Sequence, residues 1–229
     1  MQKFSATFSK FMFSERFRNT SRAKKVAAIA VFTALSVVTN MFLEFKLFDI
    51  QYSLTIFVSA VTGVFLGPLA GFLACVFGDF VGYVFNSWGQ LYMPWVGVST
   101  GFFALAAGLV FAPDFERGEV LSGNCPKKNS YGKLYLKIAL YVVITFALCT
   151  VMINSVGFYL YNKYVTGFMK AFSEYSAKNF GGNTGFFIYL LYRLFFKGQI
   201  WNSVANYALL FIFLPVFKRV VRPKADVSE

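Results

Sequence analysis

Long apolar stretches separated by short polar or basic connections dominate this chain. Between Ile50 and Pro113 the only charged side chain is Asp79. Because roughly 20 apolar helical residues cross a hydrocarbon core of about 30 Å, this stretch predicts three membrane crossings. A carboxylate at bilayer depth costs roughly 3 kcal/mol unless it is paired or lines a wet cavity. Asp79 is therefore the first candidate for a functional residue.

The same pattern over the whole chain predicts an all-α integral membrane protein with six transmembrane helices. The helix-breaking dipeptide Gly67-Pro68 separates the second apolar segment from the third. The six predicted spans are Val26–Leu43, Tyr52–Leu66, Leu69–Phe85, Tyr92–Ala112, Leu134–Phe158 and Phe186–Phe217.

Basic residues are distributed unequally between the connections. Most of them fall in the N-terminal arm, in the connection 113–137 and in the C-terminal tail. Because cytoplasmic loops carry an excess of Lys and Arg, both termini of this multi-pass membrane protein are predicted to be cytoplasmic.

This orientation divides the chain into three parts. They are a basic N-terminal segment (1–25), a six-helix membrane domain (26–217) and a cytoplasmic tail (218–229). The N-terminal segment fits two interpretations equally: an amphipathic helix on the inner leaflet, or a basic tail that only fixes the topology. The long external connection 159–185 is a candidate lid over the outer mouth.

Composition narrows the chemistry that the chain can perform. Hydrophobic residues make up 57% and charged residues 14% of 229 residues, with a mean hydropathy of +0.58. Histidine is absent, which excludes Ser-His-Asp hydrolysis and zincin motifs. The three cysteines form no CxxC pair, and no phosphate-binding glycine loop is present. We therefore expect no enzymatic activity, no metal and no cofactor. The basic residues lie at the ends of the apolar spans rather than on one polar face, so we also expect no nucleic-acid partner.

A cationic group lies in the last predicted span. Arg193, Lys197 and Trp201 follow each other at spacing i, i+4, i+8, which places them on one face of a continuous helix. Asp79 can neutralise one of the two cations, and the other is then available for an anionic ligand. The alternative is that Arg193 snorkels to the outer interface while Asp79 and Lys197 form a buried stabilising pair.

Aromatic and amide side chains crowd the connection between the third and fourth spans. Asn86, Trp88, Tyr92 and Trp95 lie close together in sequence, and aromatic faces can stack on planar heterocycles. The alternative for each aromatic residue is an interfacial belt. Asn154 lies within an apolar span, where interhelical hydrogen bonding is the alternative to ligand contact.

The first span carries a small-xxx-small pattern at Ala30 and Ala34. Small side chains allow another helix to approach closely in a membrane. The pair is a candidate interface for a partner helix.

The stretch Gly63–Gly82 resembles the signature of substrate-binding S components of energy-coupling factor (ECF) vitamin transporters, and is most similar to the folate-type members. It contains Gly-Pro-Leu-Ala-Gly followed by Gly-Asp79. Pro94 with the small residues that follow it, Asn154, and the run from Arg193 to Lys197 extend the likeness. The chain departs from the family pattern at Trp95, where a glycine is expected.

The resemblance implies a membrane subunit that captures a vitamin from outside, with folate first. Riboflavin, pantothenate, cobalamin or a queuosine precursor are the alternatives, followed by a stand-alone carrier or an intramembrane enzyme. It further implies association with a coupling transmembrane subunit, at Ala30 and Ala34, and with two ATPase subunits that hydrolyse ATP. The residue patterns and the resemblance together give the candidate substrate-binding residues, which are Arg193, Lys197, Asp79, Trp201, Asn86, Trp88, Tyr92, Trp95 and Asn154. The resemblance also implies the bacterial cytoplasmic membrane as the location.

Overall fold

The computed structural model describes residues 13–18, 20–42, 45–47, 50–85, 91–116 and 129–220. Nearly all of the described chain is helical, which confirms the predicted all-α class. The exception is a short antiparallel hairpin in which Phe45 pairs with Tyr52 and Leu47 with Ile50.

The elements follow one another along the chain as a series of helices interrupted by the hairpin. In order they are α2 (Glu15–Arg18), α3 (Arg22–Phe42), β1 (Phe45–Leu47), β2 (Ile50–Tyr52), α4 (Thr55–Leu66), α5 (Pro68–Phe85), α6 (Pro94–Glu116), α7 (Asn129–Thr145), η1 (Phe146–Ser155), α8 (Val156–Tyr161), η2 (Asn162–Thr166), α9 (Lys170–Phe180), α10 (Phe186–Leu191), η3 (Tyr192–Phe196) and α11 (Gln199–Val220). The elements η1, η2 and η3 are π-helical segments.

Several helices of the described chain are long and apolar enough to cross a membrane, as expected for a multi-pass protein. These are Arg22–Met41, Pro68–Phe85, Pro94–Pro113, Tyr131–Thr166 and Gln199–Arg219. The predicted second span corresponds to α4, which has only 12 residues and is about 18 Å long, shorter than the hydrocarbon core. The predicted fifth span is too short, because its helix continues beyond Phe158 to Thr166.

The predicted sixth span is wrong as a single helix, because the chain breaks at Lys197-Gly198. The Lys197 N–H donates to the carbonyl of Tyr192, five residues back, at 2.9 Å. Gly198 then adopts a φ of 70°, a conformation that favours glycine. A new helix, α11, starts with the Trp201 N–H bonded to the Gly198 carbonyl at 3.0 Å.

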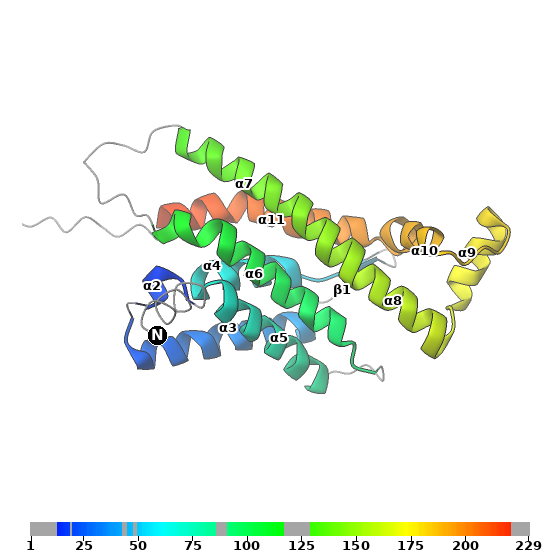
Figure 1. Cartoon of the computed structure of the whole chain (residues 1–229), viewed down its shortest axis with the longest axis horizontal. Helices are drawn as coiled ribbons and strands as arrows, with labels where there is room; N and C mark the ends of the chain where they lie inside the picture. Colours follow the sequence, from blue (N-terminus) through cyan, green and yellow to red (C-terminus); the bar gives the residue numbers. More distant parts are fainter. Residues whose placement is uncertain are drawn as a thin grey trace, which may run out of the picture.

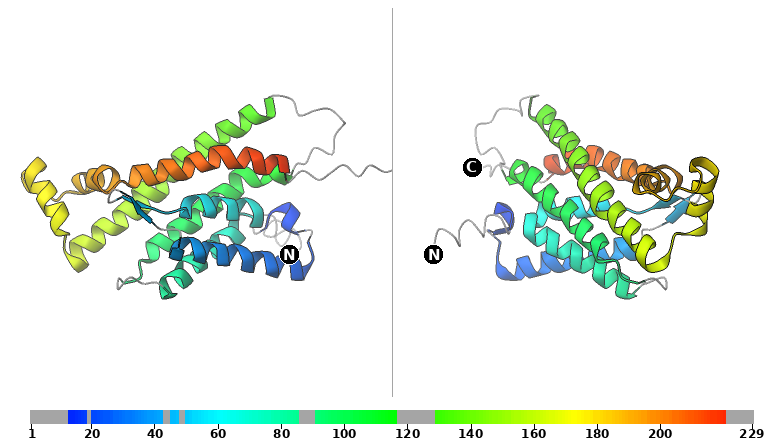
Figure 2. Two further views of the ribbon diagram at one scale, coloured as in Figure 1. Left: turned by 180° about the vertical axis from the view of Figure 1, so that it is seen from behind. Right: turned by 45° about the vertical axis from the view of Figure 1, so that its right-hand side comes forward.

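The helices run between two ends of the molecule (Figure 1). One end holds α2, the end of α6, the start of α7 and the end of α11, and the other holds the β1–β2 hairpin, the start of α6 and α9. The views in Figure 2 show the same grouping. The connections predicted to be cytoplasmic thus leave from one end and those predicted to be external from the other, as the predicted topology requires.

Helices α3 to α6 approach one another closely through small residues. A Cβ added at Gly71 would lie 2.7 Å from Gly63 Cα, and one at Gly78 would lie 2.6 Å from the Ser36 side chain. The stretch Gly63–Gly82 is therefore the seam along which α5 packs on its neighbours. A buried hydrophobic cluster joins α4 and α6 to α7 and α11. It includes Ile56, Phe103, Phe111, Ile138, Tyr141 and Leu210.

The N-terminal segment contacts the turn between α4 and α5. Ser14 bonds to two carbonyls at the end of α4, through its N–H to Leu66 (3.2 Å) and through its hydroxyl to Phe65 (2.9 Å). Phe17 is buried in a cluster with Leu66 and Ala70. Residues 1–12, on which the amphipathic-helix prediction depends, lie outside the described residues.

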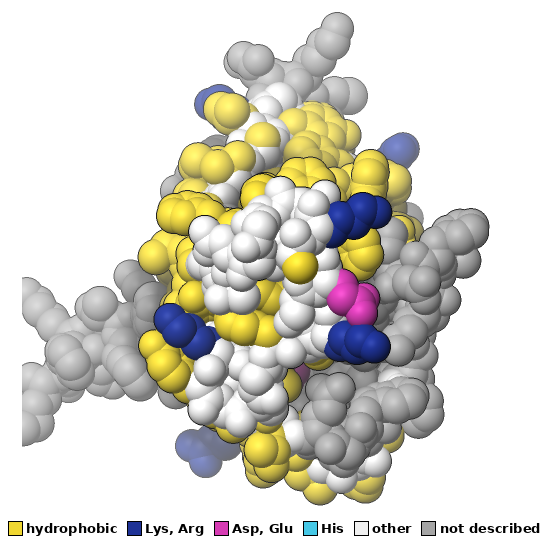
Figure 3. All heavy atoms as spheres, turned by 90° about the vertical axis from the view of Figure 1, so that its right-hand side faces the viewer, with side chains coloured by type: hydrophobic (Ala, Val, Ile, Leu, Met, Phe, Trp, Pro, Cys, Tyr) yellow, Lys and Arg dark blue, Asp and Glu magenta, His cyan; other side chains and the backbone are white. Residues whose placement is uncertain are grey.

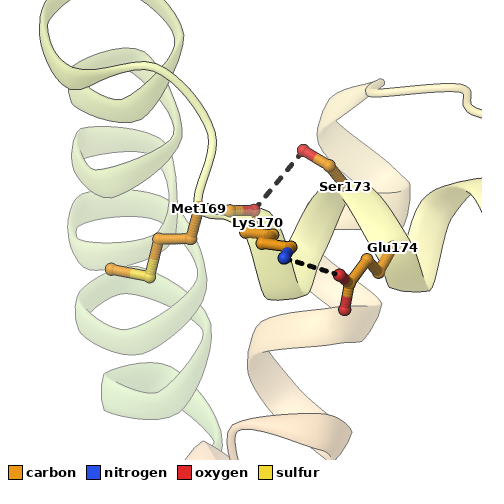
Figure 4. Close-up of polar contacts among 4 residues, drawn as sticks. All are labelled: Met169, Lys170, Ser173 and Glu174. Atoms are coloured by element: carbon orange, nitrogen blue, oxygen red, sulfur yellow. Dashed lines mark hydrogen bonds and ion pairs between the residues drawn. The ribbon is translucent and has the colours of Figure 1, made fainter.

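The connection predicted as a lid contains η2 and α9, and α9 projects beyond α8 and α10 in Figure 1. Its inner face packs through Phe172, which lies 5.3 Å from the Tyr189 and Tyr192 rings. Its outer face carries exposed polar side chains, including the pair Lys170 and Glu174 at 3.8 Å (Figure 4). Figure 3 shows this end with backbone and uncharged polar side chains (white) at its centre, hydrophobic side chains (yellow) around them, and Lys and Arg side chains (dark blue) beside them. Closure of α9 over a ligand stays a prediction.

Candidate functional site

Trp95 lies in the first turn of α6 and packs against α8. A Cβ added at Gly157 would lie 2.6 Å from the indole, so only glycine lets the two helices approach this closely. The rings of Phe158 and Tyr161 lie 5.9 and 5.7 Å from the Trp95 ring. The Trp95 Nε1 donor is buried and has no hydrogen-bond partner among the described residues.

Asn154 lies near the end of η1 and faces the same part of α6. Its Nδ2 donates to the Ser99 hydroxyl at 2.9 Å. Its Oδ1 is buried, and the described part of the chain supplies no partner for it. Leaving such an atom unpaired costs about 1–3 kcal/mol.

These two unpaired atoms lie in neighbouring turns of the same interface. Trp95 and Ser99 are four residues apart on α6, and Asn154 and Phe158 are four residues apart across the η1–α8 junction, so each pair shares a helix face. We call Trp95, Ser99, Asn154, Gly157 and Phe158 the Trp95–Asn154 site. It offers one donor and one acceptor beside aromatic rings, within a π-to-α junction of the kind often found at functional sites.

Arg193, on η3, reaches this site from the side of α10. Its Nη1 donates to the backbone carbonyl of Asn154 at 2.7 Å. Its Cζ lies 4.2 Å from the centroid of the Phe158 ring, within cation–π range. The guanidinium thus contacts two members of the Trp95–Asn154 site.

The expectation that Arg193, Lys197 and Trp201 share one helix face is wrong. The break at Lys197-Gly198 interrupts the helical register between the first and the last of them. Arg193 is partly buried, whereas Lys197 is exposed and 56% of the Trp201 surface is exposed. The structure brings only Arg193 to the Trp95–Asn154 site.

Asp79 lies on α5, and its carboxylate faces the start of α6. The Tyr92 hydroxyl donates to Asp79 Oδ2 at 3.4 Å, and a Cβ added at Gly97 would lie 2.9 Å from the same oxygen. Within the described ranges Lys197 makes no ion pair. The alternative of a buried stabilising pair between Asp79 and Lys197 is therefore not seen among the described residues.

The predicted aromatic wall is divided between two interfaces. Tyr92 packs on α5, where its ring lies 5.3 Å from Phe80 and 5.0 Å from Tyr83, whereas Trp95 packs on α8. Asn86 and Trp88 lie outside the described residues. Tyr92 and Trp95 therefore do not form one surface, although they are only three residues apart.

Ser99, Gly157 and Phe158 are members of the site that no sequence motif singles out. The one local signal was Gly157, because an isolated glycine within a helical pattern often marks a close approach. Ser99 and Phe158 are ordinary residues for a membrane helix. Only their contacts with Asn154 and Arg193 reveal them.

Ala30 and Ala34 lie on an exposed face of α3. Only 11% of the α3 window is buried inside the structure, a small share beside the 56% of α6. This face is available to a partner helix, and its role in docking stays a prediction.

Comparison with known proteins identifies the family. The model of the family described as "ECF-type riboflavin transporter, S component" matches residues 20–171 of the chain. This range includes Trp95, Asn154 and Phe158 and stops before Arg193. No match was found among individual curated proteins. Since the matched range covers more than half of a chain with several membrane-spanning helices, this protein belongs to the family of ECF-type riboflavin transporter S components.

Proposed function

We propose that this chain, a substrate-binding subunit of an ECF vitamin transporter, holds the planar ring of its vitamin at the Trp95–Asn154 site, with riboflavin as first candidate. The observation that carries the proposal is the pair of buried, unpaired atoms Trp95 Nε1 and Asn154 Oδ1. Buried polar groups are nearly always hydrogen-bonded in proteins. A ligand that offers one acceptor and one donor side by side satisfies both atoms.

Riboflavin has the chemistry that this pair requires. The edge of its ring system carries an N–H group between two carbonyls, so one carbonyl accepts from Trp95 and the N–H donates to Asn154. Phe158 and Tyr161 supply aromatic surface beside Trp95, and aromatic rings favour stacked or edge-to-face contacts. Riboflavin is uncharged, and the family description also names riboflavin.

Folate is the second candidate. Its pterin ring presents a similar donor and acceptor edge, and its glutamate tail adds two carboxylates. Lys197 is an exposed cation that follows Arg193 by four residues, and it is available to a carboxylate. A contribution of Lys197, Trp201, Asp79 and Tyr92 to binding is part of this second proposal.

The transport step is expected to involve partner subunits. Ala30 and Ala34 on α3 are proposed to contact the coupling transmembrane subunit, because small exposed residues permit close helix approach. ATP hydrolysis is proposed to occur on two partner ATPase subunits. The end of the molecule that holds the start of α6 and α9 then faces outward, so that the Trp95–Asn154 site captures the vitamin from outside.

Equilibrium binding to the purified full-length chain tests the proposal. Riboflavin and folate are titrated separately against the wild type and Asn154→Leu, and binding is followed by quenching of ligand or tryptophan fluorescence. We expect saturable riboflavin binding that Asn154→Leu weakens about tenfold or more. The control Asn179→Leu removes an exposed amide on α9 and leaves the affinity unchanged. Saturable binding of neither vitamin overturns the proposal.

A further inference from the structure

We infer that Arg193 is a positioning residue, which holds Asn154 and Phe158 in place for the vitamin without itself contacting it. The inference rests on the proposed function, because it concerns the same site. It departs from the expectation, drawn from charge alone, that the Arg193 guanidinium binds a ligand anion.

The contacts of Arg193 engage its guanidinium on two sides. Nη1 donates to the Asn154 carbonyl at 2.7 Å, a short and therefore strong charge-assisted hydrogen bond. The face of the group lies over Phe158, with Cζ 4.2 Å from the ring centroid. Both partners belong to the Trp95–Asn154 site, and both lie on the helix opposite η3.

No carboxylate among the described residues pairs with Arg193. Its charge is compensated by a carbonyl dipole and an aromatic face, both of which keep their geometry only while the η1–α8 junction stays in place. Because a planar guanidinium has a fixed direction for each contact, these two contacts hold the η1–α8 junction in one geometry. The unpaired Asn154 Oδ1 is thereby held at a defined place beside Ser99.

The η1–α8 junction is also supported by Phe158 and Tyr159, which pack against the buried cluster of Phe172, Tyr189 and Tyr192. It is the point where π-helical η1 changes to α-helical α8, and the helix continues to Gly157, which has no side chain. Arg193 bridges 39 residues of sequence to reach it. Removing the guanidinium is therefore expected to loosen Asn154 and the contact between Gly157 and Trp95 together.

Direct and indirect roles of Arg193 predict different selectivity. If Arg193 contacted the ligand as a cation, its loss would weaken an anionic ligand far more than a neutral one. If it positions Asn154 and Phe158, its loss weakens both by the same factor. Riboflavin and flavin mononucleotide share one ring system and differ by a phosphate, so they make a suitable pair of probes.

The experiment measures the affinity of Arg193→Gln for both flavins, with Arg219→Gln on the exposed end of α11 as the matched control. We expect about a tenfold loss for riboflavin and an equal factor for flavin mononucleotide, with no change in the control. The loss in the double variant Arg193→Gln/Asn154→Leu should be smaller than the two single losses combined, because part of the effect of Arg193 passes through the Asn154 side chain. Additive losses, an unchanged riboflavin affinity, or a loss confined to the phosphorylated probe would overturn the inference.

A measurement without ligand separates this inference from the proposed function. In a Trp88→Phe/Trp201→Phe background Trp95 is the remaining tryptophan, and Arg193→Gln should shift its emission to longer wavelength as the α8 contact loosens. Arg193→Lys keeps the charge but lacks the planar fork, so we expect a partial shift. An unshifted emission contradicts the positioning role even if riboflavin binds. A shifted emission in a protein that binds neither vitamin contradicts only the proposed function.

Discussion

Trp95 and Gly157 are 62 residues apart in sequence and in contact in the structure, where a Cβ on Gly157 would come within 2.6 Å of the indole. This contact joins the first turn of α6 to α8, and it positions the unpaired Nε1 donor one turn from Asn154. A site of this kind depends on close helix approach, since a single added methyl group would displace the ring.

Gly157→Ala is therefore expected to weaken riboflavin binding. The added methyl group must displace Trp95 or α8, and overpacking of this kind costs roughly 1–3 kcal/mol, which corresponds to about a tenfold loss of affinity or more. Titration of the purified variant measures the loss. The control is Gly132→Ala on α7, where a Cβ meets nothing within 4 Å. Equal affinities of the two variants would contradict the role of the contact.

Asn206→Leu is expected to destabilise the protein without a direct effect on the Trp95–Asn154 site. The Asn206 amide accepts from the Phe57 N–H at 3.0 Å and donates to the Ser53 carbonyl at 2.6 Å, so it ties α11 to the start of α4. Loss of a buried partner costs about 1–3 kcal/mol for each group left unpaired. A thermal melt in detergent should show a lower Tm, whereas the exposed Asn179→Leu melts as the wild type.

Lys197→Gln distinguishes the two candidate vitamins. If the ligand is riboflavin, loss of this exposed cation leaves the affinity unchanged, because riboflavin carries no charge. If folate binds with a carboxylate near Lys197, the affinity should fall about tenfold, as for a charge-assisted hydrogen bond. The measurement is the ratio of wild-type to variant Kd for each vitamin, and its dependence on salt concentration gives a second readout.

Ala30→Trp and Ala34→Trp are expected to separate binding from transport. Both residues lie on the exposed face of α3, away from the Trp95–Asn154 site, so vitamin affinity of the purified chain should be retained. ATP-dependent uptake by the assembled transporter should fall, because a bulky side chain keeps the partner helix at a distance.

The alanine variants are compared with a control in both the binding assay and the uptake assay. Leu136→Trp, at an exposed position on α7, serves as the matched control for insertion of a bulky residue facing lipid. Loss of binding together with uptake would show that this face of α3 supports the site. Full uptake in both alanine variants would mean that the partner subunit docks elsewhere.

The amino-acid sequence alone determined the class of the protein and the direction of its helices. Apolar segments of membrane length and the basic connections are properties of local composition, and a helix in lipid must satisfy its backbone internally wherever it lies. For the same reason Gly67-Pro68 predicted the turn that the structure shows, with Gly67 at a φ of 103°. The Gly63–Gly82 stretch indicated the family for a similar reason, because its glycines are the residues that let α5 pack closely on its neighbours.

Only the tertiary structure decided which side chains meet. The break at Lys197-Gly198 separates Arg193 from Trp201, and a regular helical periodicity cannot anticipate a π-turn followed by a glycine at positive φ. Charge alone suggested that Arg193 binds a ligand anion. Its partners in the structure are instead the backbone carbonyl of Asn154, 39 residues earlier in the chain, and the ring of Phe158, 35 residues earlier. Backbone carbonyls are present at every residue and carry no signal in the sequence, so the pairing of Arg193 with Asn154 depends on how η3 packs against the η1–α8 junction.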